Sequence, residues 1–142
     1  MGSLSGFLKQ NAVQKVNEKL IVSERFLDEN SKPMEWEVCT ITSEEDERLR
    51  KDCTKRVPIP GKKNQYTAET DYNLYLGKLA AKCTVFPNLN DKELQDSYGT
   101  MGSDAVLKAM LTPGEYAEYL SQVQRINDFD ITMEEAVDEA KN

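Results

Sequence analysis

Signals that start helices recur along this chain from Thr42 onward. Thr42 is followed three residues later by Glu45, the capping-box arrangement in which each side chain bonds the backbone N–H of the other residue. Thr112 precedes Pro113 and Glu115, which places a proline at the first helical position and a glutamate at the third. These signals predict a series of short helices in the larger, C-terminal part of the chain.

Two of the expected helices have one clean apolar face. Thr67 or Thr70 is expected to cap the first, after an extended loop over residues 57–64 in which two prolines and a glycine prevent helix. Asn90 with Glu93 is expected to start a short helix between the two. The apolar stripes are Tyr72, Tyr75, Leu76, Leu79 and Cys83 on the first helix, and Tyr116, Tyr119, Leu120, Val123 and Ile126 on the second. Their helical spacing predicts that each helix buries one side.

The first forty residues follow a different pattern. Residues 1–12 can form a short amphipathic helix with Leu4, Phe7 and Leu8 on one side. Within residues 16–41, apolar and polar residues alternate beyond a polar turn, which predicts a β-hairpin with one buried face. We expect this hairpin to be the only sheet. Because a two-stranded hairpin is marginally stable in water, we also expect it to lean on a helix or on another chain.

The length and composition are those of one domain. The chain has 142 residues, of which 39% are apolar, enough for a single core without disulfides or a metal. The predicted fold is α+β but mainly α-helical, a single compact domain with an N-terminal β-hairpin followed by about five helices. Its expected parts are an N-terminal helix at 1–12, the hairpin at 16–41, a helical core at 43–127, and an acidic C-terminal helix or tail at 128–142.

Histidine is absent from the sequence, and this excludes many kinds of active site. Ser-His-Asp and Cys-His catalysis, HExxH zinc sites and histidine proton shuttles all need the missing residue. We therefore expect no enzyme activity, no cofactor and no metal. Cys39, Cys53 and Cys83 are expected to act as buried small apolar residues, and their odd number suits a reducing cytoplasm.

The net charge of −7 argues against a general affinity for nucleic acid or anionic membranes. Basic residues do gather between residues 44 and 63, and two interpretations are open. They can form a patch for phosphate or for an acidic partner. They can also be the positively charged end of a helix followed by a solvated loop, which we favour. No apolar run approaches the length that spans a bilayer, and residues 1–15 lack the basic start of a secretory signal.

The tyrosines of the two stripes are the best candidates for a protein-binding surface, because tyrosine combines a large apolar area with a polar tip. Two helices with such stripes can flank a groove for an amphipathic helix, with residues 57–63 as its rim. The same side chains can instead form the core between the two helices, so both interpretations stay open. The predicted protein-binding residues are Tyr72, Tyr75, Leu76, Tyr116, Tyr119 and Leu120.

Many short segments along the chain resemble those of one family. They include Leu4-Ser5-Gly6-Phe7-Leu8-Lys9-Gln10-Asn11-Ala12, Pro33-Met34-Glu35-Trp36-Glu37, Ile41-Thr42-Ser43-Glu44-Glu45-Asp46, Cys53-Thr54-Lys55-Arg56-Val57-Pro58, Val85-Phe86-Pro87-Asn88-Leu89-Asn90 and Ala109-Met110-Leu111-Thr112-Pro113-Gly114-Glu115-Tyr116. From about residue 4 to residue 140, the chain is similar to the XkdN-like tail assembly chaperones of phages and prophages of Gram-positive bacteria with contractile tails.

The resemblance implies a protein that holds the tape measure protein soluble in the host cytoplasm while tail tube protein assembles around it. It also implies absence from the mature virion, and it supplies no catalytic residue. The alternative is a structural tail component, such as an adaptor or a tube-associated subunit. Because a domain of 16.1 kDa cannot cover a very long client, we expect self-association or multiple copies per client. The edge of the hairpin, or the segment with Leu4, Phe7 and Leu8, is the expected self-contact.

Overall fold

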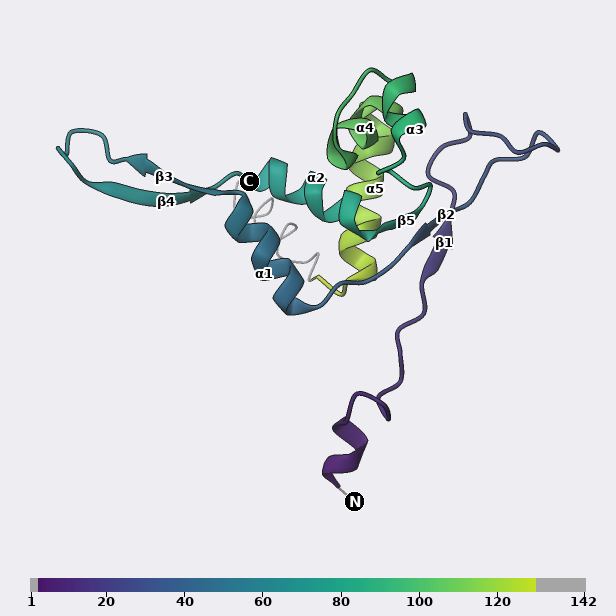
Figure 1. Cartoon of the computed structure of the whole chain (residues 1–142), viewed down its shortest axis with the longest axis horizontal. Coiled ribbons are helices and arrows are strands. Elements are labelled where there is room, and N and C mark those ends of the chain that lie inside the picture. The colour runs from purple at the N-terminus through teal and green to yellow at the C-terminus, as the bar shows by residue number, and fades with distance from the viewer. Residues whose placement is uncertain (1–2, 130–142) are drawn as a thin grey trace, which may run out of the picture.

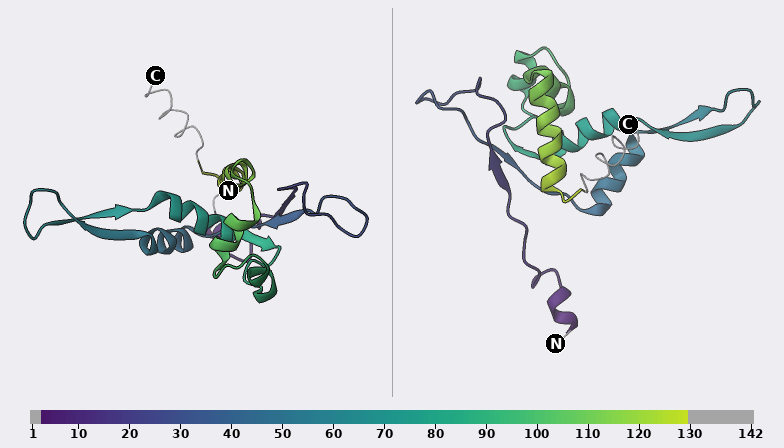
Figure 2. Two further views of the ribbon diagram at one scale, coloured as in Figure 1. Left: turned by 90° about the horizontal axis from the view of Figure 1, so that it is seen from above. Right: turned by 180° about the vertical axis from the view of Figure 1, so that it is seen from behind.

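The computed structural model describes residues 3–129, which form a helical body with three projections (Figure 1). The first projection is an N-terminal arm, residues 3–17. The second is the loop of residues 21–35. The third is a long hairpin made of β3 (Thr54–Pro58) and β4 (Tyr66–Thr70). Figure 2 shows the three leaving the body in different directions.

The predicted N-terminal hairpin is confirmed in part. β1 (Glu18–Leu20) pairs antiparallel with β2 (Trp36–Val38), and Leu20 lies opposite Trp36. Each strand has three residues, so most of the predicted hairpin is the loop that joins them. The polar turn expected in this loop is present, because the Asp28 carboxylate accepts hydrogen bonds from the backbone N–H groups of Asn30 (2.8 Å) and Lys32 (3.0 Å).

A third strand makes β2 the central strand of this sheet. β5 (Thr84–Phe86) pairs antiparallel with β2, giving the order β1-β2-β5. It directly follows α2 (Tyr72–Cys83), and the N–H of Cys39 donates to the Cys83 carbonyl at 2.8 Å. The N-terminal hairpin is therefore completed by a strand from the middle of the chain, and it rests on the helices as expected.

The expectation of a single sheet is wrong, because β3 and β4 pair antiparallel as a second sheet. The extended loop predicted over residues 57–64 is largely the tip of this hairpin. Gly61 and Asn64 take positive φ angles of 76° and 61°, so the chain can reverse there. Pro58 is the last residue of β3 and Pro60 lies in the tip, which are positions where a proline costs the sheet little.

The two predicted capping boxes are confirmed. α1 (Ser43–Asp52) begins after Thr42, whose hydroxyl accepts the N–H of Glu45 while the Glu45 carboxylate accepts the N–H of Thr42. α5 (Pro113–Ile126) begins with the same exchange between Thr112 and Glu115. Each box satisfies N–H groups that the first turn of a helix leaves free.

Two other helix starts differ from the prediction by one to a few residues. α2 is capped by Asp71, which accepts the N–H of Leu74 at 3.1 Å, because Thr67 and Thr70 belong to β4. α3 (Lys92–Ser97) is capped by Asp91 rather than by Asn90. α4 (Ser103–Met110) then begins after a glycine with positive φ. In both corrected cases an aspartate next to the predicted residue supplies the capping oxygen.

The core lies where β2 meets α2, α4 and α5. The Trp36 ring packs edge-to-face on Tyr119 with 5.2 Å between ring centroids. The buried apolar residues are Trp36, Val38, Cys53, Tyr75, Leu79, Ala80, Ala81, Cys83, Leu89, Val106, Leu107, Met110, Leu111, Tyr119, Val123 and Ile126. The α+β class and the five helices are thus confirmed for residues 3–129, while "mainly α-helical" holds only loosely because two sheets contribute.

The N-terminal helix expected over residues 1–12 is reduced to one 3-10 turn, Leu4–Phe7, with no buried residue. Ser3, Ser5 and Gly6 are poor helix formers, and no neighbouring surface packs on this turn to offset that. The acidic helix or tail expected over residues 128–142 lies outside the described residues apart from Asp128 and Phe129.

Candidate protein-binding surface

The two tyrosine stripes lie on α2 and α5, which pack against each other. Tyr75 and Tyr119 are each only 1% exposed. The Tyr75 hydroxyl donates to the Asp46 carboxylate, and the Arg50 guanidinium stacks 4.5 Å from the centre of the Tyr75 ring. Tyr119 shares a hydrogen bond of 2.6 Å with the Thr84 hydroxyl. Both rings are therefore part of the core, and neither is available to a partner in this conformation.

Burial changes the acidity of both phenols. Removal from water raises the pKa of Tyr75, and the neighbouring Asp46 carboxylate raises it further. Burial also raises the pKa of Tyr119 well above its ordinary value. Both rings stay neutral at physiological pH, since loss of the proton would leave a charge in a poorly hydrated place.

Three other predicted binding residues are half-buried. Leu76, Tyr116 and Leu120 pack against the edge of the core and keep part of their surface in solvent. The Tyr116 ring has Lys108 Nζ 6.0 Å from its centre. A partner helix could reach the outer parts of these side chains without unfolding the domain.

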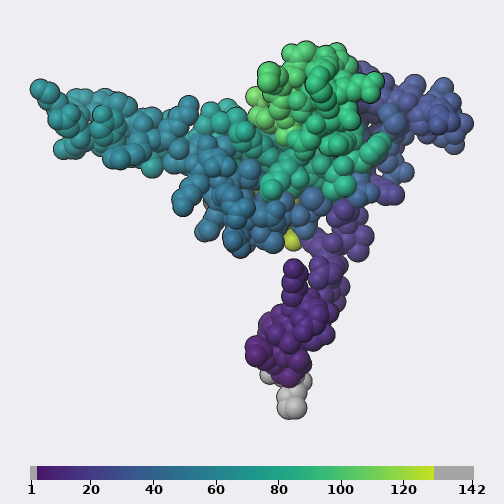
Figure 3. All heavy atoms as spheres, viewed as in Figure 1, coloured from purple at the N-terminus to yellow at the C-terminus, as the bar shows by residue number. Residues whose placement is uncertain are grey.

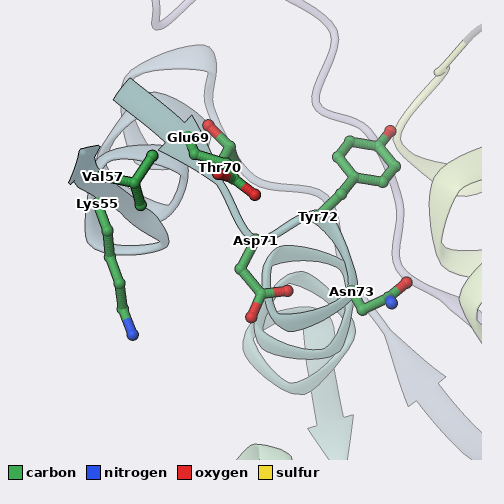
Figure 4. Close-up of a pocket in the computed structure, with 7 residues that line it drawn as sticks. All are labelled: Lys55, Val57, Glu69, Thr70, Asp71, Tyr72 and Asn73. Atoms are coloured by element: carbon green, nitrogen blue, oxygen red, sulfur yellow. The ribbon is translucent and has the colours of Figure 1, made fainter. Parts of the chain in front are cut away.

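Tyr72 is the one predicted binding residue with a largely exposed side chain, at 54%. It opens α2, and its ring centroid lies 5.7 Å from that of Tyr75. Figure 4 shows Tyr72 on one side of a pocket of about 350 Å³, with Lys55 and Val57 of β3 on the other side. The structure therefore brings Tyr72 together with Val57, the first residue of the expected rim.

The hairpin beside this pocket carries positive charge on a negatively charged protein. Residues 54–70 hold four basic residues and one acid, a net charge of +3 against −7 for the whole chain. Arg56 stacks 5.5 Å from the centre of the Tyr66 ring, and that ring is itself half-exposed. Figure 3 shows the hairpin extending well beyond the body, where a partner can reach it from several sides.

The basic stretch noted in the sequence is divided between two elements. Arg48 and Arg50 lie on α1, where each forms an ion pair with an acid one turn earlier, at 3.7 Å to Glu44 and 3.0 Å to Asp46. Lys51 lies in the last turn of α1, and the other four basic residues lie on the hairpin. The interpretation of a dipole-matched helix is thus right for α1, while the expected solvated loop is a projecting sheet.

The sequence is similar to one family of known proteins over nearly its whole length. The family model for phage XkdN-like tail assembly chaperone proteins matches residues 4–141 of the chain. The chain belongs to this family. It is 30% identical to the uncharacterized protein YqbN of Bacillus subtilis strain 168 over 140 residues, covering 98% of this chain and 93% of the relative.

Two more comparisons agree with this membership. The protein XkdN of the phage-like element PBSX of the same strain is 28% identical over the same coverage. The crystal structure of a protein yqbn superimposes with a TM-score of 0.78 at 27% identity, covering 92% of this chain and 99% of that one. The family resemblance expected from the short segments is confirmed.

Within residues 3–129, no three His, Cys, Asp or Glu side chains are placed to hold a metal ion. Cys53 and Cys83 are buried and Cys39 is half-buried, and burial raises the pKa of Cys83 to about 12. No helix in the described part of the chain is long and apolar enough to cross a bilayer.

The hairpin β3–β4 and its pocket are the parts of this surface that sequence reasoning missed. The sequence did contain a hairpin signal, since Gly61 and Asn64 flank a polar tip between two runs with β-branched residues. Pro58 and Pro60 concealed this signal, because prolines favour an interpretation as loop.

Proposed function

We propose that this protein binds the tape measure protein of its phage and keeps it soluble in the host cytoplasm until tail tube protein assembles around it. The observation that carries the proposal is membership of the tail assembly chaperone family over residues 4–141. The role requires protein binding and no catalysis, so it agrees with a chain that has no histidine. The proposal also places the protein outside the finished virion.

A physical argument supports this client. A long amphipathic helix exposes an apolar stripe until its tube is built, and such a stripe aggregates unless another surface covers it. Tyr72 and Tyr66 expose aromatic rings beside the positive charge of the β3–β4 hairpin. Aromatic rings flanked by cations can cover an apolar helix face that also carries acids.

The contact surface that we propose is narrower than the six predicted residues. Tyr72 is its centre, and the outer parts of Leu76, Tyr116 and Leu120 extend it along α2 and α5. Tyr75 and Tyr119 act indirectly, because they hold these two helices in place from within the core. Several shallow contacts of this kind give reversible binding, which tube protein can displace.

The test is co-purification with the tape measure protein encoded by the same phage. Affinity-tagged wild-type chain should retain the tape measure protein, and Y72A should retain several-fold less while melting at the same temperature. Y98A is the matched control, since Tyr98 is also an exposed tyrosine but lies at the end of α3, outside the proposed surface. Equal retention by Y72A and Y98A would remove Tyr72 from the contact. No retention by wild type would contradict the client itself.

The structural-component alternative predicts a different fate for the protein. A chaperone leaves when the tube is complete, whereas an adaptor or tube-associated subunit remains. Quantitative mass spectrometry of purified tails should find no stoichiometric amount of this chain. A fixed copy number per tail would favour the structural role.

A further inference from the structure

The N-terminal arm, residues 3–17, exposes apolar side chains that its own chain does not cover. Leu4, Phe7, Val13 and Val16 are 76%, 82%, 99% and 81% exposed. Figure 3 shows the arm standing clear of the body. Several large apolar side chains exposed in one segment indicate a site where another surface binds.

The end of the arm has a defined local structure. The Asn11 side-chain amide donates to the Ser5 carbonyl at 2.8 Å, and the N–H of Ala12 donates to the Leu8 carbonyl at 3.0 Å. These bonds fold residues 3–12 into a small knob that carries Leu4, Phe7 and Leu8. A segment that is already ordered loses less conformational entropy when it docks.

The knob has no hydrogen bond or ion pair to the body within the described residues. The arm is fixed only at its root, where Lys15 pairs with Asp128 and the Asn17 amide donates to the Glu37 carboxylate at 3.0 Å. β1 follows immediately and is an edge strand of its sheet. The arm is therefore attached to the body at its C-terminal end and exposed to solvent at its N-terminal end.

A groove lined by both apolar and charged residues lies at the opposite end of β1. Two adjoining hollows of about 190 and 550 Å³ share Ile21 and Val22 as lining. Leu20 and Gln122 also line the first hollow, and α5 forms one wall of both. The carboxylates on this groove are those of Glu24, Glu115 and Glu118, with Arg25 as its one basic side chain.

The arm and the groove have complementary charge. Residues 3–17 contain Lys9 and Lys15 and no acid, a net charge of +2. The groove carries three acids against one base, and that base, Arg25, is already bonded to Glu115 at 2.6 Å. An arm with Phe7 and Leu8 directly before Lys9 can place apolar side chains on the groove floor and its ammonium group at the acidic rim.

The direction in which the arm leaves β1 favours the arm of a second copy, and not the chain's own arm, as the segment that fills the groove. The arm leaves the N-terminal end of β1, and the groove begins at the C-terminal end, at Leu20. Figure 2 shows the arm and the segment after β1 leaving the strand in opposite directions. The arm would have to reverse past its own strand to reach its own groove, whereas the groove of a neighbour needs no reversal.

We infer that the arm of one copy docks in the groove between residues 20–25 and α5 of a second copy. The contact joins two different surfaces, so each copy keeps one free arm or groove and the assembly can extend head to tail. Every neighbouring pair in such a row would use the same arm-to-groove contact. One kind of contact between copies would therefore suffice to cover a long client. The inference deepens the proposed function by naming how the copies meet, and the chain alone suffices to test it.

The test mixes two variants that each lack one half of the contact. L4S/F7S removes the apolar side chains of the knob, and I21K places a charge on the groove floor. In sedimentation velocity, the wild type should form larger species as its concentration rises, and each variant alone should remain a monomer. The mixture should form a dimer and nothing larger, because the intact arm of I21K fits the intact groove of L4S/F7S.

Charge exchange gives a second, independent readout. K9E and E118K should each weaken assembly several-fold, and the chain that carries both changes should recover it. M101S is the matched control, since Met101 is a 92% exposed apolar residue away from arm and groove, and it should assemble like wild type. All of these side chains are exposed or half-buried, so thermal melting should show that the variants stay folded.

Three results would overturn the inference. They are a wild type that is monomeric at every concentration, an L4S/F7S variant that assembles like wild type, and a mixture of the two variants that stays monomeric. A monomeric wild type whose L4S/F7S variant loses the tape measure protein would make the arm a client contact instead. Failure of tape measure binding with assembly intact would leave this inference standing and contradict only the proposed function.

Discussion

The hydroxyl oxygen of Tyr116 on α5 lies 2.7 Å from the point that a β-carbon on Gly77 of α2 would occupy. The glycine therefore sets how closely the two tyrosine-bearing helices approach. The Tyr116 hydroxyl is buried, and no hydrogen-bond partner for it lies within the described residues. Burial and the nearby Asp104 carboxylate raise the pKa of this phenol. The Tyr116 hydroxyl therefore occupies the space that a side chain at position 77 would need.

This close fit predicts that the effects of G77A and Y116F on the free energy of unfolding are not additive. G77A alone should destabilise the protein by about 1–3 kcal/mol, the usual cost of overpacking. In the Y116F background the clash is removed. G77A should then stabilise the protein by up to about 1 kcal/mol, the gain that alanine gives over glycine in a helix. Urea unfolding of the four proteins measures the coupling. Additive effects would show that the two residues do not touch.

Burial predicts different outcomes for truncating the tyrosines of α2 and α5. Y75A and Y119A should each lose roughly 3–5 kcal/mol, because truncation leaves a cavity in the core. Y72A should change stability by less than about 0.5 kcal/mol, since its ring is largely exposed and surface changes cost little. Thermal melts compare all three. A strongly destabilised Y72A would mean that this ring supports the domain and cannot serve as a separable contact.

The Arg25–Glu115 pair predicts a pH dependence of stability. Hydrogen bonds from Arg25, Ser23 and Thr112 lower the pKa of Glu115 from 4.5 to about 2. The folded protein thus favours the ionised form, so the stabilisation is complete above pH 4.5 and is lost as the pH falls toward 2.

E115Q tests this contribution without removing the helix cap, because glutamine can also complete a capping box. Its free energy of unfolding should fall less steeply than that of wild type as the solution is acidified through this range. R25Q should flatten the curve in the same way, since it removes the largest cause of the lowered pKa. Curves that run parallel for wild type and both variants would contradict the prediction.

The cysteines are expected to react slowly in the folded protein. Burial raises the pKa of Cys39 and of Cys53, and raises that of Cys83 to about 12. Because the thiolate is the reactive form, a disulfide reagent at neutral pH should modify Cys53 and Cys83 only after denaturation, and Cys39 slowly in the folded protein. Among them Cys39, which is half-buried, should react first. Rapid reaction of a buried thiol in the native state would show that the core opens.

Much of the fold could be predicted from patterns among residues that are close in the sequence. The capping boxes at Thr42 and Thr112 need only residues within one turn, so they could be predicted, and so could the polar turn at Asp28. The pairing of β5 with β2 could not, because strands of three residues from distant parts of the chain leave almost no pattern. The β3–β4 hairpin was hidden by Pro58 and Pro60, which are tolerated at its end and tip.

The binding surface was harder to predict than the fold. Tyr72 and Tyr75 share one stripe, and spacing alone cannot tell which ring meets solvent. The answer depends on α1, which supplies Asp46 and Arg50 to Tyr75 and leaves Tyr72 uncovered. The groove is a similar case, since it joins residues 20–25 to a helix almost a hundred residues later in the chain.

The most direct measurement is the soluble fraction of the tape measure protein when it is expressed with and without this chain. With the chain, most of the tape measure protein should remain in the supernatant after centrifugation and co-elute with it. Without the chain, or with an unrelated acidic protein of similar size, most should sediment. A tape measure protein whose solubility is the same in the presence and absence of this chain would contradict the account.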